Sequence, residues 1–195
     1  MTMNSEKNPN DIFSQIKVFK GKYGTQILEN AFSYIVVFAM FAYGGGKIIQ
    51  FDGAIETNTT VSEMTGMQLM WAFYGYSKPF VITLGVLEIT GGILMLLKRT
   101  RILGCLFVTT ILINVILQDI FYDVNVGALR AAIIYQSLII IILWFNKVKL
   151  IQSFKILTTF NASDESKKEF FIKIMLSIML FVLIRILEFY VTTKW

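Results

Sequence analysis

The 195-residue chain contains no histidine and a single cysteine, Cys105. Without histidine there is no axial-histidine haem, no histidine-based zinc or copper site and no Ser-His-Asp triad. A single cysteine excludes a disulfide within the chain and a dithiol redox cycle. We therefore expect no metal site, regard haem as disfavoured, interpret Cys105 as a packing residue, and leave open whether the chain is an enzyme.

Charged residues are also scarce. They make up 16% of the chain, whereas 55% of the residues are hydrophobic. Soluble domains carry about 25% charged residues, so a single water-soluble globule is disfavoured. Intrinsic disorder is excluded as well, because so apolar a chain collapses or inserts into lipid. The composition therefore predicts an integral membrane protein.

Five apolar windows are long enough to cross a hydrocarbon core about 30 Å thick, which needs roughly 20 residues of helix. They are Ile27–Ile49, Pro79–Leu97, Ile102–Tyr122, Val126–Phe145 and Phe170–Tyr190. The connections at 98–101 and 123–125 are so short that the helices they join must be antiparallel neighbours. The predicted fold is all-α: a four-helix antiparallel transmembrane bundle over 27–146, a cytoplasmic linker over 147–169, and a fifth transmembrane helix over 170–195.

Lysine and arginine are distributed unevenly about these windows. Of the 18, 13 lie in the N-terminal stretch, in the 98–101 turn, or between Trp144 and the start of the last window. The positive-inside rule then predicts a cytoplasmic N-terminus and an external C-terminus. Because topology explains the basic excess, we expect the lipid bilayer as partner and no nucleic acid.

The first 26 residues lack the features of a cleavable signal peptide. They are predicted to form a cytoplasmic segment with an amphipathic helix at the membrane interface. Its apolar face comprises Ile12, Phe13, Ile16 and Phe19, and a similar pattern follows the fourth window at Leu150, Ile151, Phe154 and Leu157. Binding of a partner protein is the alternative role for either helix.

Ionisable residues inside a membrane span are costly and usually face the protein interior, so each is a candidate site. Glu88 lies near the middle of the second window, with Gly85 and Gly92 on the same helical face. It either locks the bundle through a hydrogen bond or ion pair, or contacts a substrate or proton. Gly44 to Gly46 either break the first helix or permit close backbone contact. Lys47 follows, one turn after Tyr43, and its alternative role is to extend to the interface.

Four charged residues from four different windows share one depth, between the midplane and the external surface. Two are cationic, Lys47 and Arg130, and two are anionic, Glu88 and Asp119. Unpaired charges at this depth are expensive, so we expect them to pair. The hypothesis is an outward-opening polar pocket formed by Glu88, Lys47, Asp119, Arg130, Tyr43, Asn114 and Gln118.

The 50–78 loop is predicted to cover this pocket. It is rich in aromatic residues, and a short interfacial helix is expected around Met67, Met70 and Trp71. Anchoring at the membrane interface is the alternative role for its aromatic residues. In the last window, Arg185 and Glu188 are three residues apart and are expected to form a structural pair.

The segment from about Tyr43 to Phe145 resembles the DoxX-like family of small four-helix bacterial membrane proteins. The resemblance rests on YGGGKIIQF at the end of the first window and on SKPFVITLGVLEITGGILMLLKRTRILG across the next two. It implies a compact bundle in the bacterial inner membrane, and Glu88 and Lys47 are the positions onto which the family pattern carries over. It also implies a loose link to quinone-reducing thiosulfate oxidoreductase subunits, while other relatives are assembly or stress-related accessory proteins.

Three functions follow as expectations. The first is a non-catalytic accessory or assembly subunit, whose partner is another membrane protein or a second copy. The second is a quinone-interacting oxidoreductase subunit, in which Glu88 exchanges protons while Lys47 and Arg130 orient ligand oxygens, because a quinone site does not need histidine. The third is a small proton-coupled transporter. We favour the first, because no nucleophile–base pair is visible in the sequence.

Overall fold

The computed structural model describes residues 9–56, 58–159 and 166–193; of residues 9–20 and 22 it describes only the backbone. Within these ranges the chain is helical, with no β-strand, which confirms the all-α prediction. The elements are α1 (Pro9–Gly46), the 3-10 helix η1 (Val61–Glu63), α2 (Gly66–Tyr76), α3 (Lys78–Leu96), α4 (Arg101–Tyr122), α5 (Val126–Phe145), α6 (Lys147–Thr158) and α7 (Lys167–Thr193).

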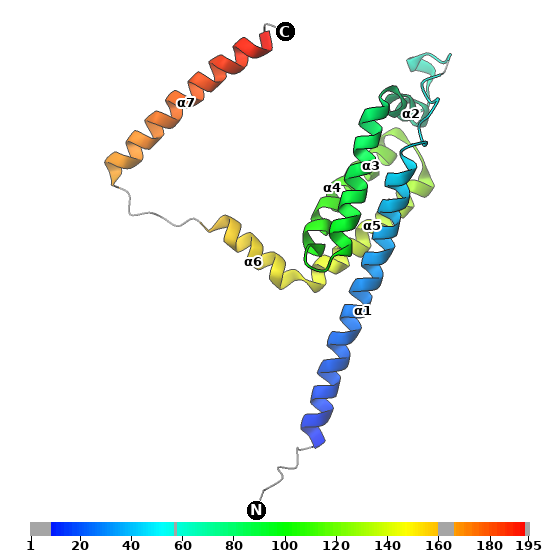
Figure 1. Cartoon of the computed structure of the whole chain (residues 1–195), viewed down its shortest axis with the longest axis vertical. Coiled ribbons are helices and arrows are strands. Elements are labelled where there is room, and N and C mark those ends of the chain that lie inside the picture. Colours follow the sequence, from blue (N-terminus) through cyan, green and yellow to red (C-terminus); the bar gives the residue numbers. More distant parts are fainter. Residues whose placement is uncertain (1–8, 57, 160–165, 194–195) are drawn as a thin grey trace, which may run out of the picture. The chain divides into compact units, whose positions relative to one another are not determined.

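The chain divides into two compact units, Met1–Gln152 and Ser153–Trp195, and the boundary falls within α6. In the first unit α1 packs against α3 and α5, and α4 packs against the same two helices, so the four form a closed ring. Figure 1 shows these helices side by side, with α2 across one end, where it contacts α3 and α4. The four-helix bundle is therefore confirmed.

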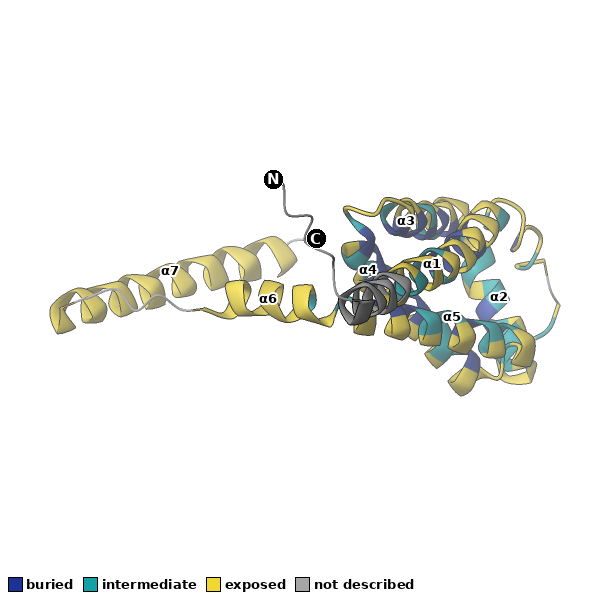
Figure 2. Cartoon of the chain, turned by 90° about the horizontal axis from the view of Figure 1, so that it is seen from below, coloured by how far each residue is buried: buried dark blue, intermediate teal, exposed yellow. Residues whose placement is uncertain are grey.

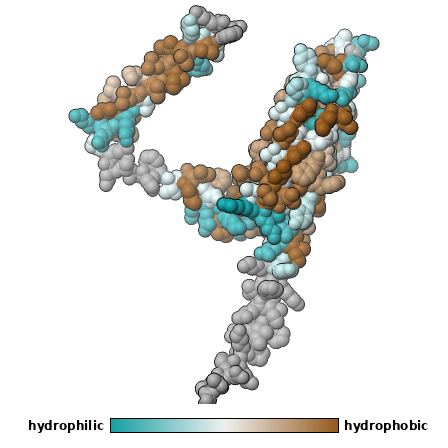
Figure 3. Space-filling model, viewed as in Figure 1, coloured by the Kyte–Doolittle hydropathy of each residue, from teal (hydrophilic) through white to brown (hydrophobic). Residues whose placement is uncertain are grey.

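Five of the described helices are long and apolar enough to cross a membrane, and the protein is a multi-pass membrane protein. The spans are Tyr23–Gly46, Lys78–Leu96, Arg101–Tyr122, Val126–Phe145 and Lys167–Thr193, close to the predicted windows. Apolar side chains cover much of the visible flank of the bundle (Figure 3), and α7 is exposed along its described length (Figure 2). Apolar surface of this extent needs lipid or protein to cover it.

The bounds of helix α1 differ from the predicted ones at both ends. It runs without a break from Pro9, whereas a separate interfacial helix was expected within residues 1–26. Gly21 and Gly24 weaken the helix by only about 1 kcal/mol each, and neither interrupts it. The predicted apolar face of residues 12–19 lies outside the described side chains. At the other end, α1 stops at Gly46 rather than Ile49, and turns follow it. Three consecutive glycines weaken the helix at this point.

Part of the predicted linker 147–169 is helical, since α6 covers Lys147–Thr158, in line with the apolar pattern after the fourth window. The rest of that linker includes residues 160–165, which lie outside the described residues.

Local signals set the sharp connection between α4 and α5. Asp123 adopts the left-handed conformation (φ 48°) directly after α4. Asp is one of the few residues that tolerate it. Asn125 then caps α5, because its side-chain oxygen accepts a hydrogen bond of 2.9 Å from the backbone N–H of Ala128. These two residues turn the chain within the three positions that separate the helices.

Helix α2 begins at a capping box. The backbone N–H of Gln68 donates to the Thr65 hydroxyl at 3.2 Å, and the Gln68 side chain accepts from the backbone N–H of Thr65 at 2.9 Å. Pro79 lies in the first turn of α3, where its missing N–H costs nothing. The short helix predicted in the 50–78 loop is therefore present, and it lies across the end of the bundle.

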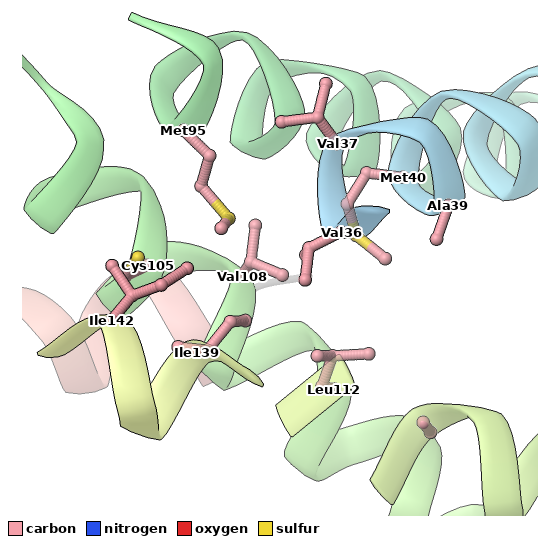
Figure 4. Close-up of a cluster of buried hydrophobic side chains, with 11 residues drawn as sticks. Val36, Val37, Ala39, Met40, Met95, Cys105, Val108, Leu112, Ile139 and Ile142 are labelled. Atoms are coloured by element: carbon pink, nitrogen blue, oxygen red, sulfur yellow. The ribbon is translucent and has the colours of Figure 1, made fainter. Parts of the chain in front are cut away.

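The apolar core fills the middle of the ring of four helices (Figure 4). Cys105 is fully buried within it, which agrees with the packing role expected for this residue. The core residues are Val36, Val37, Ala39, Met40, Met95, Cys105, Val108, Leu112, Ala132, Ile139 and Ile142.

Two glycines allow α1 and α3 to approach closely. A Cβ atom on Gly85 would lie 2.5 Å from the carbonyl oxygen of Gly44, and one on Gly44 would lie 2.7 Å from that of Gly85. Small residues serve this purpose in membrane bundles, where close backbone packing is the main source of helix association. The glycine run therefore both ends α1 and permits the tight contact that the sequence suggested.

A buried polar cluster ties the opposite end of the bundle together. The guanidinium of Arg101 donates to Glu29 Oε1 at 3.1 Å, to Asn30 Oδ1 at 2.9 Å and to the carbonyl oxygen of Met95 at 3.2 Å. Ser33 donates to the same carbonyl oxygen at 3.0 Å. Arg101 is only 4% exposed, and it links α1 to the turn between α3 and α4.

Replacing Gly85 by Ala is expected to destabilise the bundle by about 1–3 kcal/mol through overpacking. The gain in helix propensity offsets about 1 kcal/mol of this cost, so we expect a net loss of up to about 2 kcal/mol. The control is Gly45→Ala, because a Cβ on Gly45 meets nothing within 4 Å. Thermal unfolding in mild detergent measures both variants, and equal melting temperatures would show that the glycine contact is unimportant.

Replacing Arg101 by Gln is expected to destabilise the protein by up to about 3–5 kcal/mol, because the partly buried Glu29 carboxylate loses its cation. Arg99→Gln is the matched control, since Arg99 is exposed in the same turn. The same thermal measurement applies. A loss for Arg101→Gln no larger than that for Arg99→Gln would contradict a structural role of the cluster.

Candidate functional site

A cavity of about 680 Å³ lies among the four bundle helices at the end that α2 covers. Ligand sites for small molecules typically have volumes of about 300–1,000 Å³. Helices α1, α2, α3, α4 and α5 all contribute to its wall, together with the segments that follow α1 and α4. The polar and charged residues of that wall are Tyr43, Lys47, Gln50, Tyr74, Glu88, Thr110, Asn114, Gln118, Asp119, Asn125 and Tyr135.

An ion pair between the buried Glu88 and the partly buried Lys47 joins α3 to the end of α1. Lys47 Nζ lies 3.5 Å from Glu88 Oε1, and the two side chains are only 15% and 7% exposed. The ammonium also donates to Gln50 at 3.5 Å and lies 5.4 Å from the centre of the Phe51 ring. Lys47 therefore turns into the bundle rather than extending to the interface. Its place just beyond the end of α1 also suits a cation, because the helix dipole is negative there.

The close contact of the two glycines positions this pair. Gly44 precedes Lys47 by three residues, and Gly85 precedes Glu88 by three, so each charge lies nearly one turn beyond a contact glycine. A Cβ atom on Gly85 would lie 3.1 Å from Cβ of Lys47 and 3.3 Å from its Cγ. The absence of a side chain at Gly85 therefore leaves the space that the Lys47 stem fills.

Asp119 contributes a second buried carboxylate from α4. It is 7% exposed, and its Oδ2 atom has no hydrogen-bond partner. Glu88 is similar, since its Oε2 atom is also buried and unpartnered. Buried acceptors without partners are rare in folded proteins, and each one calls for an explanation.

A chain of hydrogen bonds ties α2 to α4 beside the cavity. The Tyr74 hydroxyl donates to Gln118 Oε1 at 2.7 Å, and the Gln118 amide donates to Asn114 Oδ1. Burial raises the pKa of the Tyr74 phenol above its usual value, so the group stays protonated and able to donate at neutral pH. This chain holds α2 over the end of the bundle.

Aromatic residues cover the cavity on the α2 side, and we call them the aromatic cap. The Phe51 ring packs edge-on against Trp71, with centroids 5.3 Å apart, and stacks on Tyr74 at 5.0 Å. Tyr74 also contacts Phe73 and stacks on Phe80. The prediction that the 50–78 loop covers the pocket is therefore correct, and the aromatic cap comprises Phe51, Trp71, Phe73, Tyr74 and Phe80.

The structure brings together six of the seven predicted site residues, which are Glu88, Lys47, Asp119, Tyr43, Asn114 and Gln118. For Arg130 the prediction is wrong. It is exposed on α5 and does not line the cavity, so it does not pair with the buried anions. In α7, Arg185 and Glu188 form the expected ion pair, with both side chains largely exposed.

Tyr135 of α5 is a cavity residue that the sequence analysis missed. Its ring packs edge-on against that of Tyr43, with centroids 6.4 Å apart. It lies five residues after Arg130 and therefore on a different face of the helix from that exposed residue. This spacing is the one sequence signal that points Tyr135 toward the cavity. The cluster of Glu29, Asn30 and Ser33 around Arg101 was missed too, because Arg101 was interpreted only as a marker of topology.

The arrangement suits the binding of an amphipathic molecule. The cavity combines an apolar and aromatic wall with a few fixed polar groups, which is the usual composition of a small-molecule site. The Lys47–Glu88 pair and the Tyr74–Gln118–Asn114 chain hold its polar groups in place. Within the described residues, no group of three acidic or cysteine side chains could hold a metal ion.

Comparisons with known proteins give little guidance on function. No protein-family model matches the chain, and no solved structure matches it. A protein of Bacillus subtilis (strain 168), described as "Uncharacterized protein YwoB", is 29% identical to it over 126 residues. The match covers 64% of this chain and 80% of that protein. The chain is therefore similar to another protein whose printed description states no activity.

Proposed function

We propose that the chain is a DoxX-like protein of the bacterial inner membrane that holds an amphipathic small molecule in the cavity beneath the aromatic cap. It does so as a non-catalytic accessory or assembly subunit. The observation that carries the proposal is the cavity of about 680 Å³ with a buried Lys47–Glu88 pair in its wall. Glu88 and Lys47 are also the positions onto which the DoxX-like pattern carries over.

The distribution of basic residues supports an outward-facing cavity. The 98–101 turn, with Lys98, Arg99 and Arg101, lies at the end of the bundle opposite α2. Under the positive-inside rule, this turn faces the cytoplasm. The aromatic cap then lies on the external side, and the cavity receives its ligand from the outer leaflet or from outside the cell. As an accessory subunit, the protein would also contact another membrane protein or a second copy.

A quinone-interacting oxidoreductase subunit is the second candidate. The observation in its favour is the edge-on Tyr43–Tyr135 pair, which lines the same cavity as Lys47 and Glu88. A phenol or an ammonium can donate a hydrogen bond to a quinone carbonyl oxygen. Arg130, which the sequence analysis placed in this role, is too exposed to take part.

Mass spectrometry of molecules extracted from the protein purified in mild detergent tests the proposal. We expect one small molecule at near-stoichiometric amount in the wild type. Ala128→Phe should reduce it by about tenfold or more, because Ala128 lines the cavity and the added ring fills it. Glu88→Gln should reduce it as well, whereas Glu56→Gln, at an exposed position outside the cavity, should not.

The extracted molecule also separates the two candidate functions. A bound quinone that is reduced and released on addition of an electron donor would favour the oxidoreductase. No molecule above the level of a detergent blank, or equal amounts in the wild type and Ala128→Phe, would contradict a ligand-binding role.

A further inference from the structure

Two buried carboxylate oxygens in the cavity wall have no hydrogen-bond partner, and this constrains the ligand. Glu88 Oε2 and Asp119 Oδ2 are both buried without a partner, in side chains more than nine-tenths buried. Both residues line the cavity. An unsatisfied carboxylate oxygen in a buried site is costly, and a ligand that donates hydrogen bonds removes that cost.

The charges in the cavity are unbalanced in the same direction. Lys47 is the cation in its wall, and Glu88 already engages it. Among the described residues, the structure gives Asp119 no ion pair, and Arg130 lies outside the cavity. A bound positive charge would therefore be attracted by Asp119, whereas a bound anion would meet two carboxylates.

The aromatic cap favours the same kind of ligand. Phe51, Trp71 and Tyr74 line the cavity, and the faces of aromatic rings attract cations. The ammonium of Lys47 already lies near the Phe51 ring at 5.4 Å. A metal ion is a poor fit, because hard cations such as Ca²⁺ take six to eight oxygen ligands. The described residues offer no group of three acidic or cysteine ligands.

We propose that the cavity binds a monovalent organic cation, an amine with an apolar tail, whose N–H donates to the free oxygen of Asp119. The tail occupies the apolar wall between the bundle helices, and the aromatic cap covers the charged end. The inference rests on the proposed ligand-binding function and adds the chemical class of the ligand. Asp119 supplies the charge for recognition, because the Glu88 charge is compensated by Lys47.

Three matched probes test this inference: phenylbutylamine, phenylbutanol and phenylbutyrate. They share one apolar part and differ in charge. The full-length protein is placed in nanodiscs of zwitterionic lipid, so that the lipid surface does not concentrate the amine. Binding is followed by the fluorescence of Trp71, with Trp144 and Trp195 replaced by Phe.

The amine, cationic at neutral pH, should bind about tenfold or more tightly than the alcohol, because a charge-assisted hydrogen bond is about twice as strong as a neutral one. Phenylbutyrate should bind most weakly.

Two variants locate the effect. Asp119→Asn should reduce affinity for the amine to about that for the alcohol, because the charge is lost and the shape is kept. Asp123→Asn is the control: Asp123 lies just outside the cavity, and Asn tolerates its left-handed conformation as Asp does. It should leave the preference for the amine unchanged.

The outcomes distinguish this inference from the function on which it rests. Equal binding of amine and alcohol, or tighter binding of phenylbutyrate, would overturn the inference while leaving a ligand-binding role intact. Absence of binding by all three probes would overturn both. The ranking of the probes on the unsubstituted cavity decides the matter even if Asp119→Asn fails to fold.

Discussion

The ion pair between Lys47 and Glu88 is the interaction on which the organisation of the cavity depends. A charge buried among apolar helices is tolerated only beside a partner. The partner can reach Glu88 because two glycines let α1 and α3 approach and leave space for the stem of Lys47. The glycine run therefore fixes where α1 ends, how closely it packs, and where its terminal cation lies.

Two polar clusters hold the bundle at opposite ends, with the apolar core between them. Arg101 links α1 to the α3–α4 turn through hydrogen bonds from Nε and Nη1 to Met95, Glu29 and Asn30. At the α2 end the polar groups line a cavity, and two carboxylate oxygens remain without partners. An ion pair thus ties the helices together at each end of the bundle, and a cavity lies beside the pair at the α2 end.

Depth along the helices was predictable from sequence, whereas the direction of each side chain about its helix was only partly so. Apolar run lengths located the spans, and the shared depth of Lys47, Glu88 and Asp119 predicted that they would line one pocket, although only Lys47 and Glu88 form an ion pair. Arg130 has the same depth but faces outward, because the long apolar run of α5 offers no clear polar face that would orient it. Continuity of α1 through Gly21 and Gly24 could not be predicted either, since two isolated glycines weaken a helix without deciding whether it ends.

A double-mutant cycle on Lys47 and Glu88 tests the central claim most directly. Each residue is replaced by Met alone and then together, and the free energy of unfolding is measured in detergent. Each single variant should lose about 3–5 kcal/mol, because it leaves an unpaired buried charge, and the double variant should recover most of that loss. Losses that simply add would show that the two charges do not depend on each other, and would contradict the account.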